Sequence, residues 1–361
     1  MMKILIIGLG LIGSSLALAI KKGHPNYYLI GSDTNQASLK YAQSSSLVDE
    51  TTTDFTTSAP RADVIILATP VQVIIADLQI LAKLPLKPQV LITDVGSTKQ
   101  QIMQAAQAVQ KRGFTFIGGH PMAGSHRSGV AAGSVQLLEN AFYFIVPEAT
   151  SSKAVSQLKN LLCATHNQWL VVDSRQHDRI VGQISHLPHI IAAALVNQAQ
   201  TELQDFPLGL KIAAGGFKST TRIASSDPQM WTDILLTNNP LLITQLQDYI
   251  QKLIQIKKAL QNQDPLEIKA FFTKARNTRQ QLTKNSNKDF CLTLTITAVP
   301  EAIKTIVDIL FSANLNLINI HISPIKQDNT SHLQLSFNNQ TNLSKATNLL
   351  KAAGYQILGS D

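Results

Sequence analysis

Residues 3–13 read KILIIGLGLIG, an apolar run followed by the pattern G-x-G-x-x-G. The apolar run has the length of a buried strand, and the residues after Gly13 are typical of a helix. Glycines at such a strand-to-helix turn are the signature of the first βα unit of a dinucleotide-binding sheet. This stretch therefore predicts a Rossmann-type α/β fold at the N-terminus.

Each glycine of this pattern has its own expected role in binding a dinucleotide. Gly8 makes the tight turn, Gly10 admits the pyrophosphate, and Gly13 lets the helix pack closely on the strand. The pyrophosphate is then expected to accept hydrogen bonds from backbone N–H groups at the helix N-terminus, where Leu11 and Ile12 stand.

Two further segments complete the predicted cofactor site. Asp33 ends the next β-type run, twenty residues after Gly13. A carboxylate at this place accepts a hydrogen bond from the ribose 2′-OH and repels a 2′-phosphate, so we expect NAD rather than NADP. Thr69 and Pro70 follow the run 64–68, at the edge of the sheet where ligands bind, although an ordinary proline turn explains them equally well.

From residue 3 to about residue 173, short β-rich runs alternate with helical patterns, which predicts a parallel, doubly wound sheet. The expected strands are 3–8, 28–32, 64–68, 90–94, 115–118, 142–146 and 169–172. Long helical periodicities follow, and apolar helices such as 190–196 indicate burial within the subunit or against a second copy. We expect an NAD-binding domain at 1–173 and an all-α substrate and dimerisation domain at 174–285.

The tail returns to β-type alternation. Strands are expected at 290–297, 317–322, 332–337 and 355–358, with helices at 300–313 and 343–353. This β-α-β-β-α-β order predicts a small ferredoxin-like domain at 289–361. The polar stretch 284–288 before it has the composition of a linker.

Composition limits the function classes. The 361 residues are 44% hydrophobic and 15% charged, as in a globular protein of two or three domains. The net charge of +8 is accompanied by no nucleic-acid-binding motif, so we expect no nucleic-acid partner and a mild preference for anionic ligands. Cys163 and Cys291 match no metal or redox spacing and are expected to be reduced thiols.

The N-terminus also resembles a secretory signal peptide, because a lysine precedes the uncharged run 4–20. Cleavage there would remove the glycine motif and the first strand of the sheet. We therefore expect a cytoplasmic protein. No other segment looks long and apolar enough to span a membrane.

Residues 118–129 read GGHPMAGSHRSG and place His120 in a predicted glycine-rich loop. Histidine is the side chain whose ordinary pKa allows it to accept a proton near neutrality. A base of this kind, in a chain that binds a nicotinamide dinucleotide, indicates oxidation of a hydroxyl group by hydride transfer.

Three more clusters accompany this loop: DVGSTK at 94–99, SHLPH at 185–189 and GGFKSTTRIA at 215–224. Together with the glycine pattern and the run DPQMW at 227–231, they occur in the order found in prephenate dehydrogenases, and the chain resembles that family over residues 1–285. Several spaced motifs in sequence are more specific than any one of them.

The resemblance implies a reaction and the residues that carry it. Prephenate would lose a hydride from C4 to NAD and its ring carboxylate as CO₂, giving 4-hydroxyphenylpyruvate for tyrosine biosynthesis. The family's catalytic histidine corresponds to His120, which would accept the C4-hydroxyl proton. Its catalytic serine corresponds to Ser97, which would hydrogen-bond near that centre and help to orient it.

The resemblance also implies the residues that bind the substrate. Arg222 corresponds to the arginine that grips a carboxylate, a task suited to a bidentate guanidinium. His189, with His186 as the less certain neighbour, corresponds to the second histidine of the pocket. His126 and Arg127 lie where the family selects substrate and inhibitor. Many relatives carry an acidic residue where this chain has Ser219, so how Arg222 is held stays open.

Each of these residues has a purely structural alternative. Ser97 is well placed for a helix N-cap, and both roles are compatible. Arg222 suits a structural ion pair, and Trp231 suits core packing. His186 and His189 are spaced for a shared ligand, but no H-E-x-x-H pattern or carboxylate motif accompanies them, so we expect no metal.

The tail resembles an ACT domain, the amino-acid-sensing module of some family members, which implies feedback by tyrosine or a related aromatic acid. The usual glycine at its first helix-to-strand turn is replaced by Asn314. Asparagine adopts the left-handed conformation but its side chain occupies space, so the tail either binds an effector or serves only for dimer packing.

The sequence leaves three alternatives open. The first is the same chemistry on arogenate, whose side chain carries an ammonium group. The second is a β-hydroxyacid or imine-reducing dehydrogenase, which would need a catalytic lysine such as Lys211 or Lys218. The third is a non-catalytic sensor of NAD and an amino acid, although a sensor has no need of a base.

Overall fold

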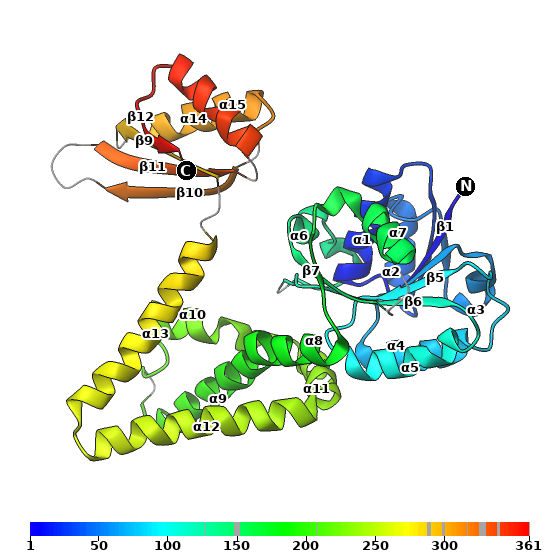
Figure 1. Ribbon diagram of the computed structural model, residues 1–361, viewed down its shortest axis with the longest axis horizontal. Helices are drawn as coiled ribbons and strands as arrows, with labels where there is room; N and C mark the ends of the chain where they lie inside the picture. Colours follow the sequence, from blue (N-terminus) through cyan, green and yellow to red (C-terminus); the bar gives the residue numbers. More distant parts are fainter. Residues whose placement is uncertain are drawn as a thin grey trace. The chain divides into compact units, whose positions relative to one another are not determined.

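The computed structural model describes residues 1–125, 127–147, 152–206, 208–286, 290–297, 300–315, 317–324, 330–337 and 340–360. Contacts divide the chain into two compact units, Met1–Gln251 and Lys252–Asp361 (Figure 1). The first unit carries the residues predicted for cofactor and substrate, and the second carries the ferredoxin-like tail.

An eight-stranded sheet forms the frame of the first unit, in the order β3-β2-β1-β4-β5-β6-β7-β8. Its strands are β1 (Lys3–Ile7), β2 (Tyr28–Ser32), β3 (Glu50–Thr52), β4 (Val64–Leu67), β5 (Leu91–Asp94), β6 (Thr115–Pro121), β7 (Phe142–Val146) and β8 (Gln168–Val171). All neighbouring strands are parallel except β6 and β7, which are antiparallel. The predicted doubly wound α/β sheet is confirmed, with one antiparallel pair and the short strand β3 in addition.

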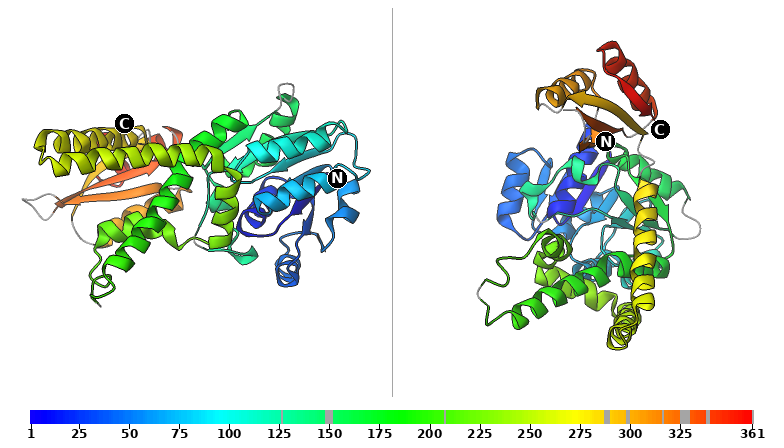
Figure 2. Two further views of the ribbon diagram at one scale, coloured as in Figure 1. Left: turned by 90° about the horizontal axis from the view of Figure 1, so that it is seen from below. Right: turned by 90° about the vertical axis from the view of Figure 1, so that its left-hand side faces the viewer.

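Helices cover both faces of this sheet (Figure 1, Figure 2). They are α1 (Leu11–Gly23), α2 (Gln36–Ser44), α3 (Phe55–Ser58), α4 (Val71–Leu81), α5 (Gln100–Gln110), α6 (Val135–Leu138) and α7 (Ser152–Leu161). In β1, Ile4 and Ile6 enter the core shared with α1, α2 and α7, whereas Leu5 and Ile7 enter the core shared with α4 and α5. Because strand side chains alternate between faces, this apolar run needs helices on both sides.

A continuous helical run follows the sheet: α8 (Ser174–Val181), the π-helical turn η4 (Gly182–His186) and α9 (Leu187–Glu202). Asp173 and Gln176 form a capping box that starts α8. The helices α10 (Gly215–Thr221), α11 (Pro228–Thr237) and α12 (Asn239–Gln261) come next, with the short turn η5 (Arg222–Ser225) between α10 and α11. Within the described part of 174–286 there is no strand, as predicted.

The run Ser174–Glu202 has the length and hydropathy of a membrane-spanning helix. The expectation that no segment beyond the N-terminus has these properties was therefore wrong. Its first half carries His177, Asp178 and His186, which are buried. Apolar composition is thus combined with buried polar residues in the same run.

The second unit contains α13 (Pro265–Ser286) and a four-stranded antiparallel sheet in the order β10-β11-β9-β12. Its elements are β9 (Phe290–Thr297), α14 (Pro300–Ser312), β10 (Leu317–Pro324), β11 (Thr330–Phe337), α15 (Gln340–Ala352) and β12 (Ile357–Ser360). The predicted β-α-β-β-α-β order is confirmed. Apolar residues of β9, including Leu292 and Leu294, pack against α14 and α15.

Two details of the tail bear on the predictions. Helix α13 continues to Ser286, so the first part of the stretch predicted as a linker is helical, and Asn287 and Lys288 lie outside the described residues. Asn314 has φ of 53° and follows α14, which is the left-handed conformation expected of a residue that replaces glycine there.

Asp77 on α4 makes stability depend on pH. It is 6% exposed, and burial raises its pKa from 3.8 to about 6. A raised folded-state pKa in an acid means that stability is fully present below the unfolded pKa and is lost as the pH rises through about 6. The difference corresponds to at most about 3 kcal/mol. We expect Asp77→Asn to have little effect near pH 4 and to raise the unfolding free energy above pH 7.

Urea unfolding of Asp77→Asn and of the unsubstituted protein, from pH 4 to above pH 7, measures the difference in unfolding free energy. Asp205→Asn, at an exposed aspartate, is the matched control. An equal difference between Asp77→Asn and the unsubstituted protein at every pH would show that the Asp77 carboxyl is not the source of the pH dependence.

Candidate active site

The glycine turn has the strand-to-helix context that was predicted for it. Gly8 has φ of +94°, and a Cβ there would lie 2.7 Å from the Ala68 carbonyl oxygen. A Cβ on Gly13 would overlap the Gly8 carbonyl oxygen. At Gly10, in contrast, a Cβ would meet no atom within 4 Å. Two glycines are therefore required by the fold itself, and the third borders open space.

Helix α1 begins at this open space. Gly10 is its N-cap and offers no side-chain acceptor, so the first N–H groups of the helix, at Leu11 and Ile12, have no partner one turn earlier. A pyrophosphate group fits this combination of open space and unpaired donors. The residues present therefore fit a dinucleotide.

Asp33 lies directly after β2 and supports the same turn. One carboxylate oxygen accepts a hydrogen bond from the Leu9 N–H at 2.8 Å, and the other accepts one from the Asn35 N–H at 2.8 Å. Each oxygen keeps a further lone pair for a hydroxyl donor. Thr69 packs toward the Gly8 turn, and Pro70 is the N-cap residue of α4.

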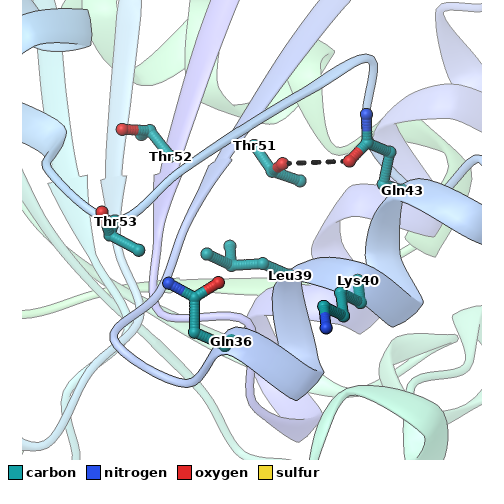
Figure 3. Close-up of a pocket in the computed structure, with 7 residues that line it drawn as sticks. All are labelled: Gln36, Leu39, Lys40, Gln43, Thr51, Thr52 and Thr53. Carbon is teal, nitrogen blue, oxygen red and sulfur yellow. Dashed lines mark hydrogen bonds between the residues drawn. The ribbon is translucent and has the colours of Figure 1, made fainter.

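A cavity of about 380 Å³ lies between α2 and the end of β3 (Figure 3). Its lining residues are Gln36, Leu39, Lys40, Gln43, Thr51, Thr52 and Thr53, and the Thr51 hydroxyl donates to the Gln43 amide oxygen at 3.4 Å. None of the site residues predicted from the sequence lines this cavity.

His120 lies in β6, where its backbone pairs with Phe144 of β7. The prediction of a loop at this position was wrong, because β6 continues through both glycines to Pro121. The His120 Nδ1 atom is 2.9 Å from Nε2 of His177, and Nδ1 of His177 is 2.7 Å from Oδ1 of Asp178. A chain of two imidazoles and one carboxylate thus joins the sheet to α8.

Asp178 is held at the N-terminus of α5. Its Oδ1 accepts from the Lys99 N–H at 2.7 Å, and its Oδ2 accepts from the Gln100 N–H at 2.9 Å. Burial alone raises the pKa of Asp178, but the hydrogen bonds from His177 and from these N–H groups lower it below the usual value. The N-cap residue of α5 is Lys99, which makes no side-chain cap, so the alternative that Ser97 caps this helix was wrong.

The turn that carries Ser97 is fixed by a buried ion pair between Lys99 and Asp94. Asp94 also accepts hydrogen bonds from the Gly96 N–H at 2.7 Å and from the Gly119 N–H at 3.1 Å. One carboxylate therefore ties the β5–α5 turn, where Ser97 is half-buried, to the strand that carries His120.

Electrostatics keeps His120 neutral. Burial, followed by the neighbouring His177 and Lys99, holds the pKa of His120 well below 6.5. Burial also lowers the pKa of His177, although the hydrogen bond to Asp178 opposes this shift. At neutral pH both imidazoles are therefore uncharged, and an uncharged His120 has the lone pair that a base requires.

A second histidine cluster borders the first. The Asn238 amide donates to Nδ1 of His186 at 3.1 Å and to the Asp178 carbonyl oxygen at 3.0 Å. Burial lowers the pKa of His186 to about 4. His189 stacks on Trp231 with ring centroids 3.6 Å apart, so Trp231 is part of this cluster.

The remaining predicted residues lie near this cluster or outside it. His189 Nδ1 is 2.8 Å from the Ser185 carbonyl oxygen. The pKa of His189 is lowered mainly by burial and to a smaller extent by the positive charge of Arg222. Arg222 is exposed in η5 and makes no ion pair with a described residue. Arg127 is exposed, and His126 lies outside the described residues.

Sequence reasoning missed His177, Asp178 and Asn238. The pair at 177–178 belongs to no motif, and only the capping box before it marks the start of α8. Among the residues that the structure describes, no three His, Cys, Asp or Glu side chains are grouped so as to hold a metal ion.

Comparison with known proteins identifies relatives along nearly the whole chain. The family model described as prephenate dehydrogenase, nucleotide-binding domain, matches residues 16–170, and that described as prephenate dehydrogenase, dimerization domain, matches residues 173–274. The chain is 37% identical to a prephenate dehydrogenase of Bacillus subtilis, covering 99% of this chain and 98% of the relative. The corresponding values for a prephenate dehydrogenase of Lactococcus lactis are 37%, 98% and 98%.

Solved structures agree in fold with about four-fifths of the chain. Prephenate dehydrogenase from Aquifex aeolicus, in complex with hydroxyphenyl propionate and NAD⁺, is 28% identical with a TM-score of 0.71, covering 78% of this chain and 98% of that one. Synechocystis arogenate dehydrogenase is 32% identical with a TM-score of 0.67, covering 78% and 100%.

Proposed function

The chain belongs to the prephenate dehydrogenase family, and from this premise we propose how its residues carry out the NAD-dependent oxidative decarboxylation of prephenate to 4-hydroxyphenylpyruvate. The observation that carries the assignment of the base is the neutral His120, hydrogen-bonded through His177 to Asp178. The experiment that tests the function is NADH formation by the purified protein with prephenate and NAD⁺.

His120 is proposed to accept the proton of the C4 hydroxyl as the hydride leaves C4. The C4 carbon then becomes a carbonyl, and loss of the ring carboxylate as CO₂ leaves its electron pair in the ring, which becomes aromatic. The phenolate oxygen formed in this way takes the proton back from His120. The overall reaction is prephenate plus NAD⁺ to 4-hydroxyphenylpyruvate, CO₂ and NADH, with no net release of a proton. Ser97, on the turn beside β6, is proposed to hydrogen-bond near the reacting oxygen.

NAD, when bound, supplies the hydride acceptor. Gly8, Gly10 and Gly13 would form the turn that faces its pyrophosphate, with donors from Leu11 and Ile12. Asp33 would accept from the ribose hydroxyls, and Thr69 and Pro70 would border the site at the end of β4.

Arg222 is proposed to bind a carboxylate of the substrate, with His189 and His186 lining the same pocket. Arg222 is exposed and makes no ion pair with a described side chain, so its guanidinium keeps all its donors for a ligand. Arg127 and His126 are proposed to contact the side-chain end of prephenate.

Replacement of Arg222 by alanine should therefore weaken substrate binding rather than chemistry. We expect the KM for prephenate to rise about 100-fold and kcat to change by less than about threefold, because a bidentate ion pair binds ground and transition states alike. Steady-state kinetics measure both constants, with exposed Arg276→Ala as the matched control. A normal KM in Arg222→Ala would remove this arginine from the substrate site.

Arogenate is the alternative substrate, because one of the similar structures is an arogenate dehydrogenase. Prephenate and arogenate differ only in the side chain, a keto group in one and an ammonium-bearing carbon in the other. A carboxylate-binding arginine does not distinguish them. Comparison of kcat/KM for the two substrates decides between these activities, and we expect prephenate to be preferred.

A homodimer formed through the helical domain is proposed. The matching family model is described as a dimerization domain, and the helices of this region expose large apolar side chains, among them Ile184, Leu236 and Ile243. Contiguous exposed apolar side chains are typical of a subunit interface. The apolar outer side of the run Ser174–Glu202 would then face a second subunit rather than lipid.

The tail is proposed to be an ACT-like domain that binds tyrosine or a related aromatic amino acid. Its ferredoxin-like strand order supports this proposal. Packing between tails in the dimer is the alternative role. Equilibrium dialysis with tyrosine distinguishes them, since only an effector site binds the amino acid.

A cytoplasmic location is proposed for the protein. The apolar N-terminal run forms β1, the glycine turn and α1, and both β1 and α1 contribute to the core of the first unit. A signal peptidase would remove an interior strand of the sheet.

A further inference from the structure

We propose that His177 and Asp178 form a positioning pair that sets the tautomer of His120, so that Nε2 of His120 is the nitrogen that receives the substrate proton. This inference rests on the proposed function only for the identity of that proton. The arrangement of hydrogen atoms follows from the hydrogen bonds themselves.

Asp178 sets the donor-to-acceptor direction of the hydrogen bonds that link it to His177 and His120. Its carboxylate accepts from the backbone N–H groups of Lys99 and Gln100 and from the Gln100 side-chain amide at 3.3 Å. These donors hold the carboxylate in its ionised form, in which it only accepts hydrogen bonds. The Nδ1 atom of His177, 2.7 Å from Oδ1, must therefore carry a hydrogen.

The position of the hydrogen on His177 fixes the position of the hydrogen on His120. A neutral imidazole that carries its hydrogen on Nδ1 has a lone pair on Nε2. The Nε2 atom of His177 is 2.9 Å from Nδ1 of His120, so Nδ1 of His120 must donate to it. The remaining nitrogen of His120, Nε2, is left unprotonated. The opposite tautomer of His120 would place two lone pairs face to face at this distance.

The pair also affects the protonated state of His120. An imidazolium ion donates from both nitrogens, and His177 is the acceptor for one of these bonds. The other titratable groups around His120 are Lys99, ion-paired with Asp94, and His186 on η4. Lys99 and His186 oppose a positive charge on His120, and a charged His177 would oppose it as well. Burial lowers the pKa of His177, and the neutral His177 provides an acceptor, which is the favourable contact.

The positioning pair comes from α8, whereas His120 belongs to the sheet. Asp178 joins α8 to the N-terminus of α5, and the Thr98 hydroxyl donates to the Thr237 hydroxyl at 2.9 Å beside it. The base is therefore oriented by the same carboxylate that seats the helical segment on the sheet.

Two substitutions of His177 separate positioning from packing. His177→Gln keeps an acceptor for His120 Nδ1 but loses the link to Asp178, whereas His177→Leu keeps a similar volume and loses the acceptor. We expect kcat to fall about 10-fold in the first variant and about 100-fold in the second, with the KM for prephenate within threefold of the normal value. His24→Gln, remote from the site, is the control for loss of a histidine.

The pH dependence of kcat/KM distinguishes the two roles, because a change in packing alone would not shift the pKa of its acid limb. Without an acceptor at position 177, the protonated form of His120 loses a hydrogen bond. The neutral form avoids an unpaired Nδ1–H donor, because its hydrogen can move from Nδ1 to Nε2. The pKa of His120 therefore falls in His177→Leu, and the acid limb of kcat/KM shifts to lower pH while its plateau drops. His177→Gln retains the normal limb. Equal losses of kcat in both variants with an unshifted limb would overturn the proposal.

Carbethoxylation by diethyl pyrocarbonate tests the same point without substrate. The reagent attacks an unprotonated imidazole nitrogen, and mass spectrometry of the His120 peptide gives its rate. In His177→Leu the hydrogen of neutral His120 moves to Nε2, so the nitrogen that faces the substrate is no longer unprotonated. We therefore expect slower modification of His120 at pH 7 in this variant. The modification rate of His24 in the same sample should be unchanged and serves as the internal reference. An unchanged or faster rate would contradict the proposal. A protein that shows the expected rates but does not oxidise prephenate would refute the proposed function and leave this inference intact.

Discussion

Replacement of His120 by asparagine is expected to lower kcat for prephenate oxidation by about 10³-fold. Asparagine still donates a hydrogen bond toward His177 from its side-chain amide, but it has no nitrogen that accepts a proton. The pKa of His120 is held well below 6.5, chiefly by burial, so the unsubstituted enzyme has its base available at neutral pH. The loss should be independent of pH, because no other residue of the cluster replaces the base.

NADH absorbance measures this loss, and fluorescence titration with NADH measures whether the cofactor still binds. We expect the dissociation constant for NADH to change by less than about twofold, because the glycine turn lies on other strands of the sheet. His24→Asn is the matched control. Turnover above one tenth of the normal rate in His120→Asn would exclude this residue as the base and would revive a lysine base such as Lys218.

Replacement of Gly10 by valine is expected to weaken NAD binding by more than about 100-fold, a loss of about 3 kcal/mol, and to leave stability unchanged. A Cβ at Gly10 meets no protein atom within 4 Å, so the new side chain has room in the protein itself. It would stand in front of the first N–H groups of α1, where the pyrophosphate is expected. Only the complex with the cofactor should therefore be disturbed.

Isothermal titration calorimetry with NADH and thermal unfolding test this prediction together. Gly359→Val is the matched control, because a Cβ there also meets nothing within 4 Å and the residue lies in the second unit. Gly13→Val should behave differently and lower the unfolding temperature, since its Cβ would overlap the Gly8 carbonyl. Normal NADH affinity in Gly10→Val would contradict the proposed pyrophosphate position.

The central fold was predictable from local sequence because its inner strands, such as β1 and β4, are buried on both faces and therefore read as continuous apolar runs. Strand β3 was missed for the opposite reason: Glu50-Thr51-Thr52 is three residues long and carries no apolar side chain. The extension of β6 was missed because glycines disfavour strands. Gly118–Pro121 is paired only because β7 returns beside it in the antiparallel direction, which is a non-local contact.

The site was predictable to a smaller extent. His120 and Ser97 belong to glycine-containing segments at the ends of adjacent strands, and their surroundings in the sequence identify them. His177 and Asp178 lie 57 residues or more after His120 in the sequence. The sequence pattern of their helix, α8, indicates only that the helix is amphipathic. Their role depends on how α8 docks against α5, and a single sequence contains no signal for that contact.

The most direct test of the proposed reaction is a stoichiometric assay in which the purified full chain is given prephenate and NAD⁺ and both NADH and 4-hydroxyphenylpyruvate are quantified. We expect one NADH for each 4-hydroxyphenylpyruvate, little turnover with NADP⁺, and loss of both products in His120→Asn. Absence of both products from a protein that binds NADH normally would contradict the proposed reaction.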